Sequence, residues 1–300
     1  MDIENKFKNF TGNILFNYSL KKLNWFNIGG VTKIYFKPNS LNELIEFLKL
    51  YKDNKNLFVI GAGSNILIND DIFDGAVIKL TKNFSRISLL NQNTIIAGSG
   101  VLDKTVSDFA MENSLGGFEF LSCIPGTIGG GIKMNAGCFG KEIKDILVSI
   151  QAIDKNGNIL TIPAKKINFD YRNNDLSDDL IFLSASFKGK KQDTQRILET
   201  MSKLKSKKDN NQPTKIKTSG STFKNPINKT TKKVWELIKE SVPADTKFGD
   251  ACISEKHSNF FVNKNNASFN DMKKLINFVE KSVFKKTGIK IEKEIKILEN

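Results

Sequence analysis

The sequence predicts an α+β protein with more than one domain, and three observations lead to this prediction. The chain has 300 residues, which is enough for two or three domains that each bury a core. Short apolar strands and amphipathic helices follow one another along its whole length. The stretch Gly116–Gly140 holds eight of the 21 glycines, and such a cluster is typical either of a turn-rich connection or of a backbone pressed against a ligand.

The amino-terminal elements predict a β-α-β unit. Residues 31–38 alternate as a strand that ends at Pro38, residues 41–50 carry a helical apolar stripe, and residues 57–60 form a short buried strand. This last strand leads directly into the glycine-rich turn GAGSN at 61–65.

The turn at 61–65 does not fit a Rossmann dinucleotide site. The GxGxxG pattern would need glycine at position 66, where the chain has Ile66, and residues 66–68 continue as a strand instead of opening a helix. Successive backbone N–H groups in such a turn can still form a concave site for a pyrophosphate. The sequence therefore predicts a phosphate-binding turn of another kind.

The remaining elements follow from the same patterns. Residues 146–154 and 159–162 are predicted to form a hairpin around 156–158, and residues 180–187 form a further strand. The Lys-rich run 203–217 is interpreted as a solvated linker, and the closing residues 289–298 alternate as one strand with Glu294 on its polar face. The other expected segments are strands at 77–80, 94–97 and 260–262 and helices at 102–114, 194–205, 234–242 and 272–283, the last with Ser268 and Asn270 as capping candidates.

Composition excludes several classes of protein. Hydrophobic residues make up 39% of the chain, which argues against disorder, and no window approaches the roughly 20 apolar residues that a membrane span needs. The three cysteines form no CxxC pair, so we expect no disulfide framework and no metal site. His257 is the only histidine and lacks a nucleophile elbow, which argues against Ser-His-Asp chemistry.

The net charge of +14 has two interpretations. It can mark nucleic-acid binding, but the excess is mostly lysine and is spread along the chain. We therefore expect no nucleic-acid partner and no membrane partner, and an anionic small substrate would use only a few of these charges.

Six motifs, in this order, resemble the UDP-N-acetylenolpyruvoylglucosamine reductase family over nearly the whole chain. They are GAGSN at 61, IPGTIGG at 124 followed by MNAG at 134, YR at 171, GSTFKNP at 220, SEKHSNF at 254 and IEKEIKIL at 291. The resemblance implies a flavoenzyme with an FAD-binding two-subdomain fold of the vanillyl-alcohol-oxidase type and a carboxy-terminal α+β substrate domain. It further implies an FAD-binding subdomain at 1–80, a second at 81–204, a substrate domain at 205–288 and a returning strand at 289–300.

The resemblance also assigns roles to individual residues. It implies that residues of the two glycine-rich segments bind FAD: Gly61, Ala62, Gly63, Ser64, Asn65, Ser122, Pro125, Gly126, Thr127, Gly129, Gly130, Asn135 and Gly137. It places the UDP-linked enolpyruvyl substrate near Tyr171, Lys224, Asn225 and His257. It names Arg172, Ser221 and Glu294 as the catalytic residues.

The reaction implied by the resemblance belongs to peptidoglycan precursor synthesis. NADPH would give a hydride to N5 of FAD and leave, and the hydride would pass to C3 of the enolpyruvyl group of the substrate, giving UDP-N-acetylmuramate. Arg172 would bind the substrate carboxylate as a two-pronged donor, and Glu294 would hydrogen-bond the same group if it carries or shares a proton. Ser221 would deliver the proton to C2.

Some positions depart from the family pattern. Asn27 replaces a basic residue, and Cys123 and Cys138 stand where glycine and alanine are common, which we interpret as small residues without a redox role. Only a brief polar connection follows Arg172, which is typical of the family form without a long substrate-covering loop, so no side chain can be assigned to the uridine.

Two other functions stay open at this point. The chain could be another FAD oxidoreductase of the same fold, or a basic nucleotide- or RNA-binding protein that uses its glycine loops for phosphate. The carboxy-terminal motifs argue against the first, and the lack of stacked-aromatic RNA motifs argues against the second. We expect a cytoplasmic monomer.

Overall fold

The structure is a computed structural model that describes residues 7, 10–51, 56–213 and 216–299. The chain divides into two compact units. Unit 1 comprises Met1–Asn17, Ile34–Ala62 and Gly75–Lys208, and unit 2 comprises Tyr18–Lys33, Gly63–Asp74 and Asp209–Asn300. The finer division into domains at 1–80, 81–204, 205–288 and 289–300 stays a prediction.

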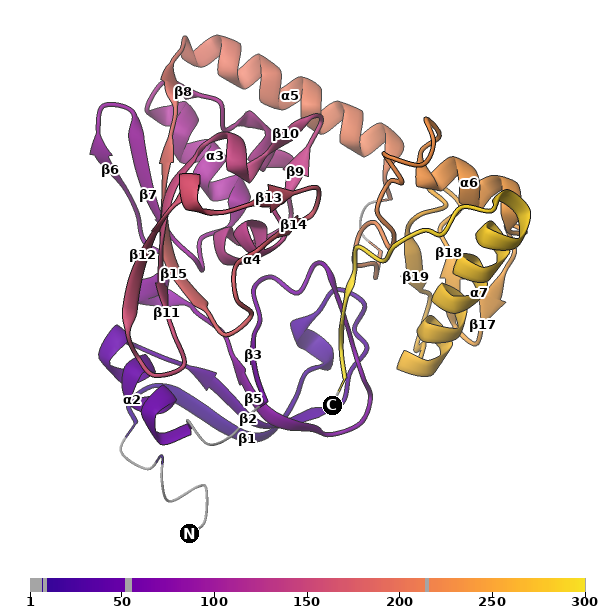
Figure 1. The fold of residues 1–300 in the computed structure, drawn as a ribbon, viewed down its shortest axis with the longest axis horizontal. Coiled ribbons are helices and arrows are strands. Elements are labelled where there is room, and N and C mark those ends of the chain that lie inside the picture. The colour runs from indigo at the N-terminus through magenta and orange to yellow at the C-terminus, as the bar shows by residue number, and fades with distance from the viewer. Residues whose placement is uncertain (1–6, 8–9, 52–55, 214–215, 300) are drawn as a thin grey trace. The chain divides into compact units, whose positions relative to one another are not determined.

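A four-stranded sheet with one covering helix forms the amino-terminal part of the fold (Figure 1). Its strand order is β1-β2-β5-β3, and β3 pairs parallel to β5. Helix α2 presses Phe47 and Tyr51 into a stack of aromatic rings that includes Phe36 and Phe7. The elements are β1 (Asn13–Ser19), β2 (Val31–Lys37), α2 (Leu41–Tyr51), β3 (Leu57–Val59) and β5 (Phe73–Ile78).

An antiparallel five-stranded sheet, ordered β12-β11-β15-β7-β6, carries the glycine-rich stretch of unit 1. Helices α3 and α4 lie on one of its faces, and their apolar residues join one buried core with those of the strands (Figure 1). The strands are β6 (Ile87–Asn91), β7 (Thr94–Gly98), β11 (Leu147–Ile153), β12 (Ile159–Pro163) and β15 (Ile181–Lys188). The helices are α3 (Asp103–Glu112) and α4 (Ile128–Lys133).

Short elements connect these layers. Three two-stranded pairs are β8 (Leu115–Gly116) with β16 (Lys190–Lys191), β9 (Gly137–Cys138) with β10 (Lys141–Glu142), and β13 (Phe169–Asp170) with β14 (Asn173–Asn174). The 3-10 turns are η1 (Lys21–Leu23), η2 (Lys82–Phe84), η3 (Glu119–Cys123), η4 (Ile143–Asp145) and η5 (Ala164–Lys166).

Unit 2 has its own core, built from two helices on a small antiparallel sheet (Figure 1). Helix α7 begins with a capping box in which Ser268 and Asp271 exchange hydrogen bonds, and it ends at Gly288 with φ of +71°. The elements are β4 (Ile66–Ile68), α6 (Val234–Ser241), β17 (Lys247–Phe248), β18 (Ala251–Ile253), β19 (Phe261–Asn263), α7 (Phe269–Thr287) and β20 (Lys296–Leu298).

Two sequence expectations were wrong. The run 203–217 is not a linker at its start, because α5 (Thr194–Asn211) continues as a helix until Pro213 excludes further turns. Thr214 and Lys215 lie outside the described residues. The segment 289–298 is not one strand: only Lys296–Leu298 forms β20, which pairs parallel to β4.

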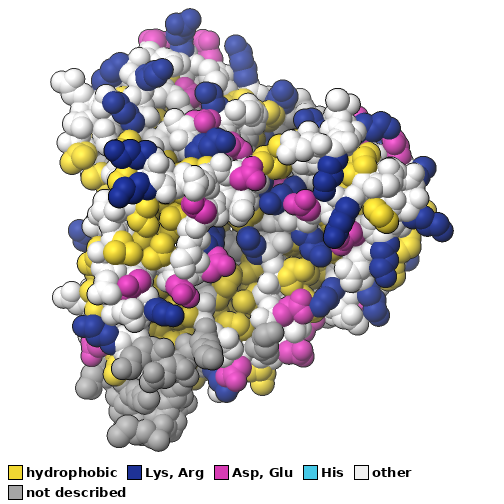
Figure 2. Space-filling view, in the orientation of Figure 1, with side chains coloured by type: hydrophobic (Ala, Val, Ile, Leu, Met, Phe, Trp, Pro, Cys, Tyr) yellow, Lys and Arg dark blue, Asp and Glu magenta, His cyan; other side chains and the backbone are white. Residues whose placement is uncertain are grey.

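Charged side chains of both signs are visible on one face of the molecule (Figure 2). On the face shown in Figure 2, Lys and Arg side chains are scattered and interspersed with Asp and Glu, with no single-signed stripe. In the described part of the chain, every helix is too short or too polar to cross a bilayer. No three His, Cys, Asp or Glu side chains among the described residues lie close enough together to hold a metal ion.

Candidate active site

We call residues Ile124–Gly131 the glycine wall. Some of its glycines face closely packed protein atoms, and one faces open space. A Cβ on Gly126 would lie 2.5 Å from Asp103 Oδ2, and one on Gly129 would lie 3.1 Å from Ser99 Cβ. A Cβ on Gly130 would meet nothing nearer than Thr127 Oγ1, at 3.6 Å. Glycine is therefore needed at 126 and 129 for close packing inside unit 1, whereas at 130 it leaves the surface open.

Unit 1 holds free backbone donors beside this open side. The N–H groups of Gly61, Ala62 and Gly130 donate to no backbone acceptor in the described part of the chain. A side chain on Gly61 would collide with the Thr127 hydroxyl, so the turn after β3 lies directly against the glycine wall. Closely spaced N–H donors without a side chain in front of them fit a phosphate or pyrophosphate. The residues present in unit 1 therefore fit this part of an FAD molecule.

The turn residues Gly63, Ser64 and Asn65 belong to unit 2. Gly63 has φ of +68°, and a Cβ there would collide with the Leu23 carbonyl. The Asn65 side chain donates from Nδ2 to the Glu294 carbonyl at 3.1 Å. One of the two amide N–H donors of Asn65 is thus used within unit 2.

Unit 2 brings the predicted catalytic residues Ser221 and Glu294 to neighbouring backbone segments. The carbonyl of Thr222 accepts the N–H of Glu294 at 2.8 Å and the N–H of Ile295 at 3.3 Å. These bonds interrupt the expected strand at 289–298, because both N–H groups turn to the same carbonyl. Glu294 is half-buried and not solvent-exposed. Two residues far apart in sequence therefore lie on adjacent backbone segments.

Asn259 is a buried residue that fixes the segment of Ser221, and the sequence patterns did not single it out. Its Oδ1 accepts the N–H of Phe223 at 3.0 Å, and its Nδ2 donates to the Phe223 carbonyl at 2.9 Å. Its own carbonyl accepts the N–H of Thr222 at 2.8 Å. The signal that could have found it was its place in the SEKHSNF motif, beside the histidine.

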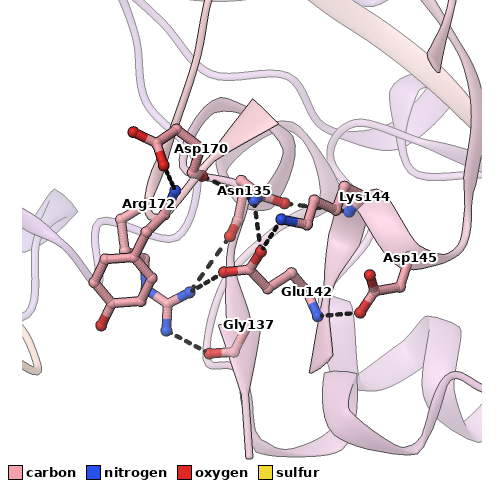
Figure 3. A network of polar contacts seen from close by, with 8 residues as sticks. Asn135, Gly137, Glu142, Lys144, Asp145, Asp170 and Arg172 are labelled. Carbon is pink, nitrogen blue, oxygen red and sulfur yellow. Dashed lines mark hydrogen bonds and ion pairs between the residues drawn. The ribbon is translucent and has the colours of Figure 1, made fainter. Parts of the chain in front are cut away.

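Arg172 is anchored by main-chain carbonyls in unit 1 (Figure 3). Its Nη2 donates to the Gly137 carbonyl at 2.7 Å and its Nη1 to the Asn135 carbonyl at 3.4 Å. The guanidinium carbon lies 5.1 Å from the centre of the Tyr171 ring, and the side chain is only 16% exposed. The residue has φ of +55°, a left-handed conformation that costs free energy for a residue with a Cβ. The structure thus holds Arg172 in one orientation.

Glu142 is an acidic partner of Arg172 that the sequence did not reveal. Its Oε1 lies 3.7 Å from Arg172 Nη1, and its Oε2 accepts from Asn135 Nδ2 at 3.0 Å and pairs with Lys144 Nζ at 2.9 Å (Figure 3). Asn135 is completely buried and also donates to the Asp170 carbonyl. The Asn135 side chain therefore holds Glu142, its main-chain carbonyl holds Arg172, and the residue is fully buried.

The other predicted residues have mixed surroundings. Asn225 Oδ1 accepts the N–H of Val234 at 3.0 Å, so this oxygen caps helix α6. His257 Nδ1 accepts the N–H of Asn259 at 3.2 Å, which leaves Nε2 as the N–H donor of the neutral ring. Burial lowers the pKa of His257. The Ser122 hydroxyl donates to the Glu119 carbonyl at 2.6 Å.

Comparison with known proteins finds two family models along the chain. Residues 32–163 match the model of an FAD binding domain, and residues 212–298 match that of the UDP-N-acetylenolpyruvoylglucosamine reductase C-terminal domain. These two matches define a flavoenzyme in which an FAD binding domain is joined to the carboxy-terminal domain of a reductase.

The relatives narrow this class to one family. The UDP-N-acetylenolpyruvoylglucosamine reductase of Pelagibacter ubique is 66% identical over 98% of this chain and 97% of its own length. That of Rickettsia typhi is 45% identical over 93% of this chain and 94% of its own length. The crystal structure of the Thermus caldophilus enzyme superposes with a TM-score of 0.82 at 26% identity, covering 96% of this chain and 99% of that one. The chain belongs to the UDP-N-acetylenolpyruvoylglucosamine reductase family, which serves peptidoglycan precursor synthesis.

Proposed function

We propose that this chain uses NADPH to reduce the enolpyruvyl group of UDP-N-acetylglucosamine enolpyruvate to UDP-N-acetylmuramate. Family membership supports the substrate class. The geometric observation that carries the catalytic assignment is the bonding of the Thr222 carbonyl to the N–H groups of Glu294 and Ile295, because it joins the segments of Ser221 and Glu294. The alternative of an RNA-binding protein gains no support from the scattered charges of Figure 2.

The free N–H groups of Gly61, Ala62 and Gly130 would hold the phosphates of FAD. When bound, FAD supplies hydride transfer between a nicotinamide and the substrate double bond. The remaining predicted contacts, from Ser64, Thr127 and their neighbours in both glycine-rich segments, stay part of this proposal.

Arg172 would bind the substrate carboxylate and stabilise the negative charge that develops beside C2. Its two terminal nitrogens already donate to the carbonyls of Gly137 and Asn135, so the guanidinium cannot rotate freely and its other N–H groups are pre-oriented. Tyr171, which stacks on the guanidinium, would contribute to the same site.

Ser221 would deliver a proton from its hydroxyl to C2, and Glu294 would hydrogen-bond the substrate carboxylate. A serine hydroxyl is a weak acid, so it has to regain its proton from a neighbouring group or from water. Lys224, Asn225 and the Nε2–H of His257 would contact the UDP part of the substrate. The pKa of His257, lowered by burial, favours a neutral donor there.

The test is NADPH oxidation by the FAD-loaded protein with and without UDP-N-acetylglucosamine enolpyruvate. We expect strong stimulation by this substrate and formation of UDP-N-acetylmuramate, detected by mass spectrometry. Equal NADPH oxidation with and without the sugar would contradict the proposal. NADH in place of NADPH tests the choice of nicotinamide, and size-exclusion chromatography tests the expectation of a monomer. A cytoplasmic location is part of the proposal and agrees with the three cysteines being free thiols.

A further inference from the structure

Two cysteines that flank the glycine wall lie in contact with each other. Cys123 ends η3 and Cys138 ends β9, two elements that pack against each other, and the two thiols lie within reach of a hydrogen bond. Cys123 is 5% exposed, whereas Cys138 is partly exposed. Nothing in the sequence indicated this pairing, since the two residues were interpreted only as small neighbours of the cofactor.

The surroundings of the pair are cationic. The positive charges of Lys208 and Arg172 act on the Cys138 thiol, and Lys208 Nζ also donates to the Cys123 carbonyl at 2.9 Å. Lys141 is the register partner of Cys138 on β10, and Ser122 Oγ lies 3.8 Å from Cys123 Sγ. Nearby cations favour a thiolate, the form that reacts with disulfides.

We propose that Cys123 and Cys138 form a reversible disulfide when the protein meets a low-molecular-weight disulfide such as oxidised glutathione. The Cys138 thiolate, the more exposed of the two, attacks the reagent, forms a mixed disulfide and releases one thiol. Cys123 then attacks the Cys138 sulfur and releases the second thiol. The protein loses two hydrogens and two electrons in total, and the reagent is reduced to two thiols.

The pKa of the Cys138 thiol limits the rate of this reaction. The hydrogen bond between the two thiols, together with burial, raises the pKa of the Cys138 thiol, and this effect exceeds the opposing effect of Lys208 and Arg172. Only a small fraction is therefore thiolate at neutral pH. We expect the rate of disulfide formation to rise with pH between 7 and 9.

Formation of the disulfide would affect Arg172, because the residue next to Cys138 is hydrogen-bonded to it. An S–S bond is about 2.05 Å long, much shorter than a thiol–thiol hydrogen bond, so closure pulls β9 toward η3. Gly137, the residue before Cys138, supplies the carbonyl that accepts from Arg172 Nη2 at 2.7 Å. Oxidation would therefore displace the guanidinium. This consequence rests on the proposed role of Arg172, whereas the disulfide itself does not.

The experiment treats the full-length, FAD-loaded protein with oxidised glutathione at pH 8, then blocks free thiols with N-ethylmaleimide and maps the digest by mass spectrometry. We expect a cross-linked peptide pair containing Cys123 and Cys138, a loss of two hydrogens, and full labelling at Cys252. Dithiothreitol should reverse the change. The variant C252S should still form the cross-link, and C138S should not.

Several results would overturn the proposal. These are full labelling of Cys123 and Cys138 after oxidation, a glutathione adduct on Cys138 that never resolves, or a disulfide that includes Cys252. Reoxidation of the reduced flavin by the enolpyruvyl substrate, measured on the same sample, tests the link to Arg172. We expect at least tenfold slowing that dithiothreitol restores, and an unchanged rate in cross-linked protein would overturn that link. Because mass spectrometry detects the cross-link directly, the disulfide proposal is tested even if the proposed substrate is wrong.

Discussion

At the scale of single residues, Asp103 has the most unusual chemical environment. The side chain is completely buried at the first residue of α3, and both carboxyl oxygens lack a hydrogen-bond partner in the described part of the chain. Burial raises its pKa from 3.8 to about 8. Asp103 is therefore neutral at pH 7, directly behind Gly126 and Gly131.

Replacing Asp103 by asparagine should change how stability depends on pH. The folded-state pKa lies above the unfolded value, so the wild type keeps its full stability below about pH 4 and loses part of it as the pH rises to about 8. An asparagine side chain cannot ionise. We expect the free energy of unfolding of D103N, relative to wild type, to increase between pH 5 and 8 by a few kcal/mol. Urea unfolding at several pH values measures this, and parallel curves for both proteins would show that Asp103 does not titrate in this range.

Arg172 should be sensitive even to a change that keeps its charge. Lysine cannot donate to both the Gly137 and Asn135 carbonyls while also offering a fork to a carboxylate. We expect R172K to slow flavin reoxidation by the enolpyruvyl substrate on the order of 10²-fold. Flavin reduction by NADPH should change by less than about threefold, because the group that Arg172 would bind belongs to the substrate. E142Q serves as the matched control: it keeps the size of the side chain beside Arg172, and we expect it to slow flavin reoxidation less than R172K does.

At the scale of elements, the glycine wall combines two uses of the same residue type. Gly126 is pressed against Asp103 and Gly129 against Ser99, whereas Gly130 has room for a methyl group. Glycine inside the six-residue helix α4 also costs helix stability relative to alanine. Gly126 and Gly129 are therefore needed for packing, whereas Gly130 is the position that leaves room for a ligand.

Alanine substitutions at 126 and 130 should show this difference. G126A places its Cβ 2.5 Å from a completely buried carboxyl, so we expect a lower melting temperature of the apoprotein. G130A should fold at least as well as the wild type but bind FAD at least tenfold more weakly, because its methyl group occupies the open side. Thermal unfolding and titration with FAD separate the two effects. Equal FAD affinity in G130A and wild type would place the cofactor elsewhere.

The elements that could be predicted from the sequence are those whose signals are local. The capping box at Ser268 marks the start of α7, and the apolar stripe marks α2 almost to its last residue. The prediction of one strand at 289–298 was wrong. Apolar and polar residues alternate along this segment, but the backbone N–H groups of Glu294 and Ile295 both donate to the Thr222 carbonyl and so leave the strand pattern. Such long-range pairing leaves no local pattern.

At the scale of the whole molecule, the ordered motifs identified the family, but they could not show which polar groups the fold uses internally. The side chains of Asn65, Asn135 and Asn225 were predicted to face ligands, yet each makes hydrogen bonds inside its own unit. Conversely, Glu142 and Asn259 could not be predicted because an isolated glutamate or asparagine is usually exposed. Only the fold reveals that they hold Arg172 and the segment of Ser221.

The central proposal is that the two glycine-rich segments hold FAD, whereas Ser221 supplies the proton that completes reduction of the substrate. Stopped-flow measurement of both half-reactions in S221A tests it most directly. We predict that flavin reduction by NADPH stays within about threefold of wild type, while reoxidation by UDP-N-acetylglucosamine enolpyruvate slows by orders of magnitude. Equal slowing of both half-reactions, or a reoxidation rate like that of the wild type, would contradict the claim.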